Sequence, residues 1–411
     1  MNALALAALA AALLVLVPSA ILALECLAAC LPAPRSRVRM LRAPRTVVLV
    51  PAHDEETCLP TALRSLEPEL AEGDRVLVVA HNCSDRTAMV ARARGAEVVE
   101  ARDDGTGGKP DALKAGLRHL DADPPEVVVI VDADCRVEPG AVRALALAAA
   151  ESGGPVQGDY RFAAGSDDGF GTLSSLAVLV KNVVRPCGLT RLGLSCLLNG
   201  AGSAYPFQPL RDAPHGEGSI AEDYQLAIDL AKRGYPTRFV REARVTSVLP
   251  ERGEVALRQR RRWEHGHLAL VFRTAPALLA RGLFTLDRHV FFLGVDLLVP
   301  PLAFLVLALG ASTTLAAFVW IATGASAALW TALAACVLFA GGLASALVRF
   351  AGADALYSVL RRMPSYVFRK LPLYLGFFGR RETRWRKTER GSSPPAPRTD
   401  ENGHDRTGTG D

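Results

Sequence analysis

The sequence lacks the patterns that mark several common kinds of site. Its eight cysteines form no CxxC pair and no paired framework, which is typical of a protein in a reducing compartment. Its eight histidines form no HExxH motif, and His265-Gly-His267 lacks the i, i+4 spacing of a zinc site on a helix. We found no internal repeat. These absences argue against a disulfide framework and against a zinc site of that kind.

Two familiar nucleotide-binding motifs are missing as well. The first apolar strand, residues 46–50, is not followed by GxGxxG, which argues against dinucleotide redox chemistry. The segment around Lys109 fails as a phosphate-binding P-loop, because Asp103 stands where glycine is needed and Pro110 stands where a hydroxyl is needed. NTP hydrolysis is therefore disfavoured.

Apolar residues are abundant, and they are concentrated in two blocks. Of the 411 residues, 50% are hydrophobic, and the mean hydropathy of +0.20 is high for a soluble enzyme. Residues 1–31 open with an apolar run long enough to cross a hydrocarbon core about 30 Å thick as a helix. Residues 290–349 form the second block, which has room for two spans. We predict one transmembrane helix in 1–31 and two more near 297–321 and 326–348.

Basic residues predict the orientation of these helices. Five arginines and no acidic residue lie between residues 32 and 45, and residues 361–390 carry ten Lys or Arg against two Glu. Since basic residues beside a span resist translocation, we expect residues 45–288 to be cytoplasmic in a multi-pass protein of the inner or plasma membrane. A cleaved signal peptide is the alternative, because Leu27-Ala-Ala-Cys30 resembles a lipoprotein cleavage box. The first residues, however, lack the positive charge that such peptides carry.

The end of the chain differs in composition from both blocks. Residues 353–390 mix aromatic with basic residues and are interrupted by Pro364 and Pro372, which predicts helix lying in the cytoplasmic interface and not another span. Residues 391–411 are rich in Pro, Ser, Gly, Thr and charge, and are predicted to be disordered.

Residues 45–288 have the pattern of one α/β domain. Buried strands are predicted at 46–50, 75–80 and 127–132, each followed by a helical pattern, at 57–66, 84–94 and 139–151, with a further helix starting at Pro110. Strand and helix alternating at this spacing predict a parallel sheet with helices on both faces. Ligands bind such sheets beyond the carboxyl ends of the strands. Polar residues follow all three strands there, over 51–56, 81–85 and 132–134.

Asp132-Ala-Asp134 ends the third strand and is the clearest candidate metal site. Alternate positions of an extended chain point the same way, and two carboxylates that close repel each other unless a cation lies between them. Oxygen ligands of this kind suit Mg²⁺ or Mn²⁺. The alternative is a pair of solvated loop aspartates.

Glu222 and Asp223 form a second acidic pair. Ser219 as N-cap with Glu222 three residues on would be a capping box, which explains Glu222 structurally. Asp223 is not explained by that box. A carboxylate at a helix start facing the crevice could accept a proton from a hydroxyl nucleophile.

Two basic elements could bind phosphate. Gln259-Arg-Arg-Arg-Trp263 places guanidinium groups beside an indole, which suits phosphate and sugar, although a basic helix face held near anionic lipid is the alternative. RNA binding is disfavoured because no recognition module accompanies the motif. Lys109, before a helix opened by Pro110, could meet a phosphate or be a solvated loop lysine.

With these residues in place, residues 45–390 resemble the membrane-embedded processive glycosyltransferases of family two, which include cellulose, chitin and hyaluronan synthases and bacterial exopolysaccharide synthases. The resemblance rests on four elements in the family's order, followed by transmembrane spans: Pro51-Ala-His-Asp-Glu55, Asp132-Ala-Asp134, Ala221-Glu-Asp223 and Gln259-Arg-Arg-Arg-Trp263. It implies a nucleotide-sugar domain of the GT-A type and an inverting transfer.

The resemblance also implies residue roles. Asp223 would be the general base and Asp134 the metal ligand, with Asp132 contacting both metal and nucleotide. The substrate-binding residues would be Pro51, His53, Glu55 and Asp85 for the nucleoside, Lys109, Gln259 and Arg262 for the diphosphate, and Glu222 and Trp263 for the acceptor. The family often carries Asp after the second strand, where Ala80-His81-Asn82 stands here, so the likeness does not imply uridine.

We therefore expect a metal-dependent transferase that adds sugar from a nucleotide-sugar donor to a growing polysaccharide at the cytoplasmic membrane face, a position that would allow synthesis to be coupled to export. One N-terminal and two C-terminal spans make a slim channel, so a homo-oligomer, an export partner or a transferase that needs no channel stays open. Two alternatives remain: a transferase that adds one sugar to a lipid or lipid-linked acceptor, and a non-catalytic membrane scaffold. No nucleic-acid partner is expected.

Overall fold

The computed structural model describes residues 3–32, 42–103, 108–163, 169–214, 221–248 and 254–379. The strands are β1 (Thr46–Ala52), β2 (Arg75–His81), β3 (Glu97–Ala101), β4 (Val127–Ile130), β5 (Cys135–Val137), β6 (Val156–Ala163), β7 (Ser203–Pro206) and β8 (Arg238–Val248). The helices of the sheet domain are α2 (Leu59–Leu66), α3 (Thr87–Ala93), α4 (Lys109–Leu120), α5 (Ala141–Ser152), α8 (Phe207–Arg211) and α9 (Glu222–Lys232), with a 3-10 turn η1 (Glu67–Glu69).

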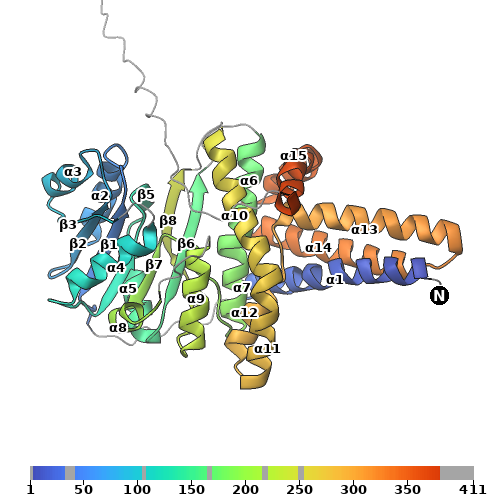
Figure 1. The fold of residues 1–411 in the computed structure, drawn as a ribbon, viewed down its shortest axis with the longest axis horizontal. Helices are drawn as coiled ribbons and strands as arrows, with labels where there is room; N and C mark the ends of the chain where they lie inside the picture. The colour runs from blue at the N-terminus through green and yellow to red at the C-terminus, as the bar shows by residue number, and fades with distance from the viewer. Residues whose placement is uncertain are drawn as a thin grey trace, which may run out of the picture.

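The remaining helices form a long bundle and the segments that connect this bundle to the sheet domain (Figure 1). They are α1 (Ala3–Cys30), α6 (Gly169–Leu179), a π-helical turn η2 (Val180–Val184), α7 (Arg185–Arg191), α10 (Glu254–Arg273), α11 (Ala275–Thr285), α12 (Arg288–Leu297), α13 (Leu302–Thr323), α14 (Ala327–Ala351) and α15 (Ala353–Gly379).

The sheet is mixed, with strand order β3-β2-β1-β4-β7-β6-β8-β5. The first four of these strands are parallel, as predicted, whereas β7 runs antiparallel to both β4 and β6, and β5 runs antiparallel to β8. The prediction of a wholly parallel sheet is therefore wrong for its second half. The strands of that half are short, or carry polar residues such as Gln157 and Asp159, so they do not show the continuous apolar runs of buried parallel strands.

Helices cover both faces of the parallel half. Val47 and Leu49 of β1 pack into a core that includes α4 and α9, while Val48 and Val50 pack into a separate core with α2 and α5. Alternate residues of one strand point to opposite faces, so a strand that is apolar at every position must be covered on both. This arrangement leaves only the strand ends open to a ligand.

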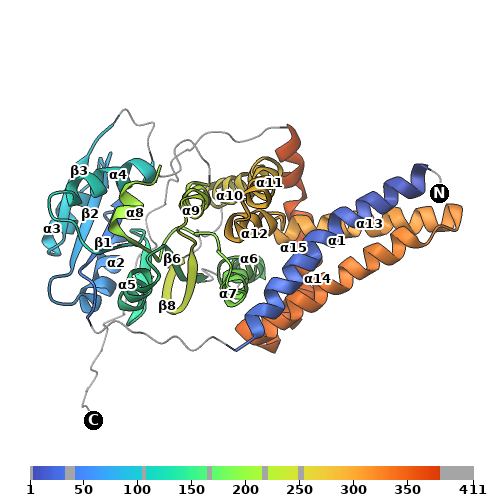
Figure 2. The same cartoon turned by 90° about the horizontal axis from the view of Figure 1, so that it is seen from below.

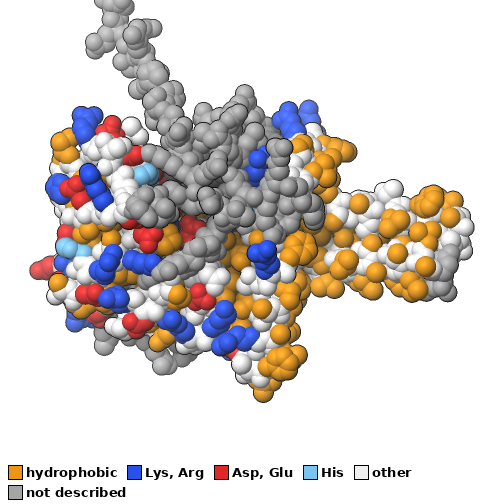
Figure 3. Space-filling view, in the orientation of Figure 1, with side chains coloured by type: hydrophobic (Ala, Val, Ile, Leu, Met, Phe, Trp, Pro, Cys, Tyr) orange, Lys and Arg blue, Asp and Glu red, His pale blue; other side chains and the backbone are white. Residues whose placement is uncertain are grey.

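Three helices, α1, α13 and α14, are long and apolar enough to cross a membrane; the bent pair formed by the end of α10 with α11 would be a fourth. The three pack along one another and form the bundle that projects from the sheet domain (Figure 2). Apolar side chains cover much of their outer surface (Figure 3). A large exposed apolar surface is typical of a region that contacts a membrane or another protein. The predicted span at 297–321 starts later, at Leu302, because Pro300 and Pro301 lack the N–H donors that would continue α12.

The predicted interfacial segment forms α15, a helix that continues through Pro364 and Pro372. It packs on α6, α13 and α14, and Lys370 forms an ion pair with Glu264 of α10. Residues 380–390 and the predicted disordered tail, 391–411, lie outside the described residues.

A buried ionic group joins the bundle to the sheet domain. Arg185 of α7 contacts the Glu25 carboxylate of α1 at 2.7 Å and the Asp296 carboxylate of α12 at 2.5 Å. All three side chains are almost fully buried. Removing one member of such a group leaves an uncompensated buried charge, so the contact fixes where α1 meets the domain.

Candidate active site

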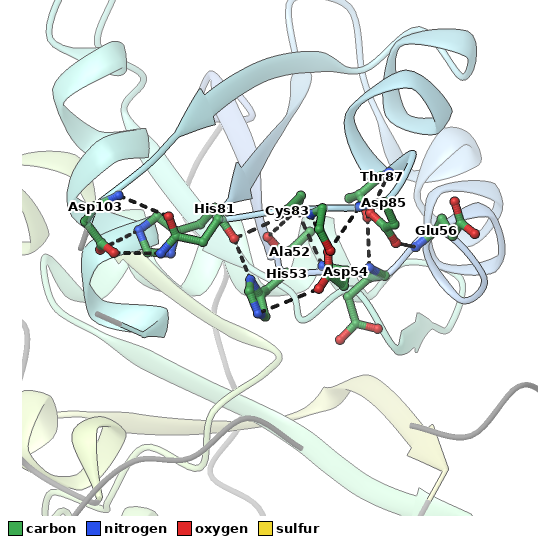
Figure 4. A network of polar contacts seen from close by, with 12 residues as sticks. Ala52, His53, Asp54, Glu56, His81, Cys83, Asp85, Thr87 and Asp103 are labelled. Atoms are coloured by element: carbon green, nitrogen blue, oxygen red, sulfur yellow. Dashed lines mark hydrogen bonds and ion pairs between the residues drawn. The ribbon is translucent and has the colours of Figure 1, made fainter. Parts of the chain in front are cut away.

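The loops after β1 and β2 are bound to each other by polar side chains (Figure 4). Asp54 has a left-handed backbone (φ 53°), and its Oδ1 accepts hydrogen bonds from the amides of Ser84 (2.6 Å) and Asp85 (3.3 Å). Asp85 accepts the Glu56 amide at 3.0 Å and the Thr87 amide at 2.9 Å. The two loops therefore form one rigid wall beyond the strand ends.

The residues predicted for the nucleoside pocket belong to this wall. Pro51 is a half-buried residue of β1, and His53 Nδ1 donates to the carbonyl of His81 at 2.7 Å. The Glu55 amide donates to Thr87 Oγ1 at 2.8 Å, and its carboxylate accepts the Cys58 thiol. Asp85 lies among them, so the structure brings these four predicted residues together.

A carboxylate that the sequence did not point to lies beside this wall. Asp103, which follows β3, contacts His81 Nε2 at 2.9 Å and accepts a hydrogen bond from Asn82 Nδ2 at 2.6 Å. Asp103 thus places a carboxylate beside residues 80–82, where the family that the sequence resembles often carries Asp. Only the parallel pairing of β3 with β2 could have indicated this.

Asp132 and Asp134 converge, but not in the way predicted. Strand β4 ends at Ile130, and the Cys135 amide donates to the Asp132 carbonyl at 3.0 Å, so residues 132–135 form a turn and not extended chain. Ligand atoms of Asp132, Asp134 and Cys135 still lie within 4.8 Å of one another. The turn, and not strand alternation, brings the carboxylates together.

The chemistry of this group fits a hard divalent cation. Burial and then the neighbouring Asp134 and Asp132 raise the pKa of the Cys135 thiol well above its usual value, so the sulfur stays protonated and is a poor ligand. Asp134 Oδ2 accepts a hydrogen bond from Ser247 at 3.2 Å, which orients its carboxylate. Oxygen ligands alone are what Mg²⁺ and Mn²⁺ prefer.

Lys109 lies between two acids rather than in an open loop. Its Nζ is 2.7 Å from Asp132 Oδ1 and 3.8 Å from Asp223 Oδ1. Burial alone would lower the pKa of Lys109, but Asp132 and Asp223 outweigh it and raise the pKa, so the ammonium stays charged. The alternative of a solvated loop lysine is therefore wrong.

Asp223 and Glu222 occupy the first turn of α9. The helix begins at Glu222 with Ala221 as N-cap, so Glu222 is its first residue and not its third; Ser219, the predicted cap, lies outside the described residues. Both carboxylates therefore lie where the helix dipole favours negative charge. Asp223 and Asp132 both contact the ammonium group of Lys109, so the start of α9 and the segment after β4 meet there.

A glycine loop that the sequence analysis missed closes the site. A Cβ at Gly200 (φ 99°) would lie 3.3 Å from Asp223 Oδ2 and 3.9 Å from Asp132 Oδ2. The loop is held by Gln157, whose side chain is fully buried. Its amide donates to the carbonyls of Ala201 (3.1 Å) and Gly202 (3.3 Å), and its Oε1 accepts the Asn199 amide (2.8 Å).

Replacing Gln157 by Leu is expected to lower the free energy of unfolding by about 1–3 kcal/mol, because buried loop groups lose their partners. The sugar transfer that the sequence resemblance implies should fall further, by about 100-fold, since a shift of about 1 Å beside Asp223 misaligns the reacting groups. Thermal unfolding and initial rates in membranes test both. The matched control is Gln208→Leu, an exposed glutamine with one hydrogen bond to Asp212, which should change neither. Equal behaviour of the two variants would contradict the role of Gln157.

Trp263 is linked to the site by two aromatic contacts. Its ring centroid lies 5.6 Å from that of Phe162, which in turn lies 5.0 Å from that of Tyr160. Burial, and then the neighbouring Cys135, Asp134 and Asp132, raise the pKa of Tyr160 well above its usual value, so this residue lies beside the acidic group. Gln259 and Arg262 belong to α10, but their side chains lie outside the described residues.

Comparison with known proteins agrees with this geometry. The family described as glycosyltransferase like family 2 matches residues 44–266, just over half of the chain. The probable glycosyltransferase YdaM of Bacillus subtilis (strain 168) is 26% identical over 251 residues, which cover 58% of this chain and 59% of YdaM. The chain thus matches about three-fifths of that relative's length.

Among solved structures, the mannosyltransferase PcManGT from Pyrobaculum calidifontis, in complex with GDP-Man and Mn²⁺, is similar with a TM-score of 0.55 and 20% sequence identity. The match covers 92% of this chain and 99% of PcManGT, so the α/β fold is of the GT-A type. The matched family model, which runs from just before β1 into α10 and includes every acid of this site, assigns the chain: it belongs to glycosyltransferase family 2.

Proposed function

We propose that this glycosyltransferase is an inverting, metal-dependent enzyme that moves a hexosyl group from a nucleotide sugar to an acceptor at the membrane surface. The observation that carries the proposal is the convergence of Asp132, Asp134, Lys109 and Asp223 at one edge of the sheet. The complex of PcManGT with GDP-Man and Mn²⁺ supports the same class of donor and ion here.

The chain's own residues supply the steps. The wall of Pro51, His53, Glu55 and Asp85 would hold the nucleoside, and Lys109 would offset charge on the diphosphate. Asp134, with Asp132, would hold a Mg²⁺ or Mn²⁺ ion, which neutralises negative charge on the departing diphosphate when bound. Asp223 would accept the proton of the acceptor hydroxyl as that oxygen attacks the anomeric carbon from the face opposite the diphosphate, which inverts the configuration.

The bundle favours a lipid-anchored acceptor. Near the N-terminal end of α1 its core is filled by small apolar side chains, among them Ala8, Ala12, Ala316 and Ala332. Closer to the sheet domain, larger side chains such as Leu22, Leu305 and Phe339 fill it. Small residues let helices approach closely, so a hydrophilic polymer would have to displace a packed core to cross here. A lipid-anchored acceptor needs no such path, because only its polar end has to reach Asp223.

A growing polysaccharide is the second candidate acceptor. The neighbouring rings of Phe162 and Trp263, which are only partly buried, favour it, because aromatic faces beside a transfer site suit a chain of sugar rings. In this case a second copy of the chain or an export partner would have to provide the path across the bilayer.

The product distinguishes the two acceptors. We expect membranes that contain the protein, incubated with a panel of labelled nucleotide sugars, to transfer label into a solvent-extractable lipid carrying one sugar. A labelled polymer of high molecular weight would replace the lipid acceptor by the polysaccharide. If no donor in the panel is consumed faster than in membranes with Asp223→Asn, the proposed transfer is wrong.

A further inference from the structure

Lys109 is held beside the candidate metal group by acids and not by its own helix. It is the first residue of α4, with Gly108 as N-cap, and the helix dipole disfavours a cation at that end. Its Nζ lies 2.7 Å from Asp132 Oδ1 and 3.8 Å from Asp223 Oδ1, and its side chain is only 18% exposed. In the part of the chain that the structure describes, these two acids are its only ion-pair partners. The position of the ammonium group therefore depends on the charges around it.

Asp132 is shared between Lys109 and the candidate metal group. Its ligand atom lies within 4.8 Å of those of Asp134 and Cys135, and it is also the acid closest to Lys109. Its Oδ1 is buried, and no donor of the described residues reaches it with the alignment of a hydrogen bond, although Lys109 lies within contact distance. Buried polar atoms are rarely left in this state. The oxygen is therefore suited to accept an ion in place of the lysine.

A divalent ion and the ammonium group compete for this carboxylate. Mg²⁺ or Mn²⁺ carries two positive charges and would share Asp132 with Lys109, in a partly buried site where water screens charge poorly. Like charges this close repel, so each cation weakens the binding of the other. A diphosphate relieves the repulsion, because its oxygens can pair with both cations and the start of α4 offers it backbone N–H groups.

We propose that Lys109 makes the metal site depend on the donor: without a diphosphate its ammonium group occupies Asp132 and weakens binding of the free ion, and a diphosphate draws it away. The inference rests on the proposed function, because it assumes a sugar diphosphate and a divalent ion. It adds that the two bind as a pair and that Lys109 couples them. Removing the ammonium group should therefore strengthen the binding of the ion alone.

Titration of the full-length protein in detergent with Mn²⁺ alone, followed by the electron paramagnetic resonance signal of the free ion, tests this without catalysis. Lys109→Met should lower the dissociation constant of Mn²⁺ by roughly 10-fold or more, as expected when a positive charge is removed from beside the ion. Lys109→Arg keeps the charge and should bind Mn²⁺ as the wild type does. The matched control is Lys114→Met, which removes a lysine of the same helix paired with Asp111 and should leave the affinity unchanged.

Thermal unfolding verifies that each variant is folded, and Lys109→Gln, whose polar end can stay beside Asp132, replaces Lys109→Met if the latter does not fold. Wild-type or weaker affinity for Mn²⁺ in the uncharged variant overturns the inference and leaves the proposed metal in place. Tighter binding by Lys109→Arg as well overturns it too, since the charge would then not be the cause. If neither the wild type nor any variant binds Mn²⁺, the inference and the metal dependence of the proposed function are both wrong.

Discussion

Asp223→Asn is expected to lower kcat for sugar transfer by about 100- to 10,000-fold, the usual contribution of a general base. The amide has the size of the carboxylate, so it fits against Gly200, where a Cβ would come within 3.3 Å of the Asp223 oxygen. It cannot accept the proton of an acceptor hydroxyl. Donor turnover and labelled product in purified membranes measure the effect.

Asp223→Asn also weakens the ion pair with Lys109, so a loss of donor binding has to be separated from a loss of proton transfer. Nucleotide affinity should change little, since Lys109 keeps its closer contact with Asp132 at 2.7 Å. The matched control is Asp229→Asn, an acid of the same helix that contacts Gln225 and Lys232 and should leave transfer unchanged. Wild-type turnover in Asp223→Asn would exclude it as the base.

The sequence predicts the parallel half of the sheet well, because its strands are continuous apolar runs that only a doubly covered sheet can accommodate. It fails where strands carry polar side chains. Gln157 of β6 is such a case: the hydrogen bonds by which it holds the glycine loop go to residues more than 40 positions away, and nothing local indicates them. Pairing set by tertiary contacts is not visible in periodicity.

The site, like the sheet, has features that the sequence predicts and features that only the fold reveals. Asp132 and Asp134 are predictable because two acids directly follow an apolar strand, and Asp223 because a capping box does not explain it. Their geometry is not predictable, since Asp132 and Asp134 meet through a turn and Lys109 is placed by its ion pairs. Asp103 is found only because β3 pairs with β2. Chemistry can therefore be inferred from residue type, whereas the partner of each residue requires the fold.

The second large effect concerns Asp134. Asp134→Asn is expected to weaken Mn²⁺ binding strongly and to lower transfer by roughly 1,000-fold, corresponding to about 4 kcal/mol of charge stabilisation. Only Asp132 would remain as a carboxylate ligand in this group, and it is already paired with Lys109. Chelation of the wild type should give a similar loss that added Mn²⁺ or Mg²⁺ reverses.

Binding of the ion can be followed without activity, from the electron paramagnetic resonance signal of free Mn²⁺ during titration. The matched control is Glu138→Gln, which removes the same charge from an exposed acid just after β5, paired with Arg244, and should bind Mn²⁺ as the wild type does. If Asp134→Asn retains the wild-type affinity, or if chelated enzyme still transfers sugar, the ion does not lie at this turn. The charge of the departing diphosphate would then have to be offset by Lys109 and the arginines of α10, as expected of a metal-independent transferase.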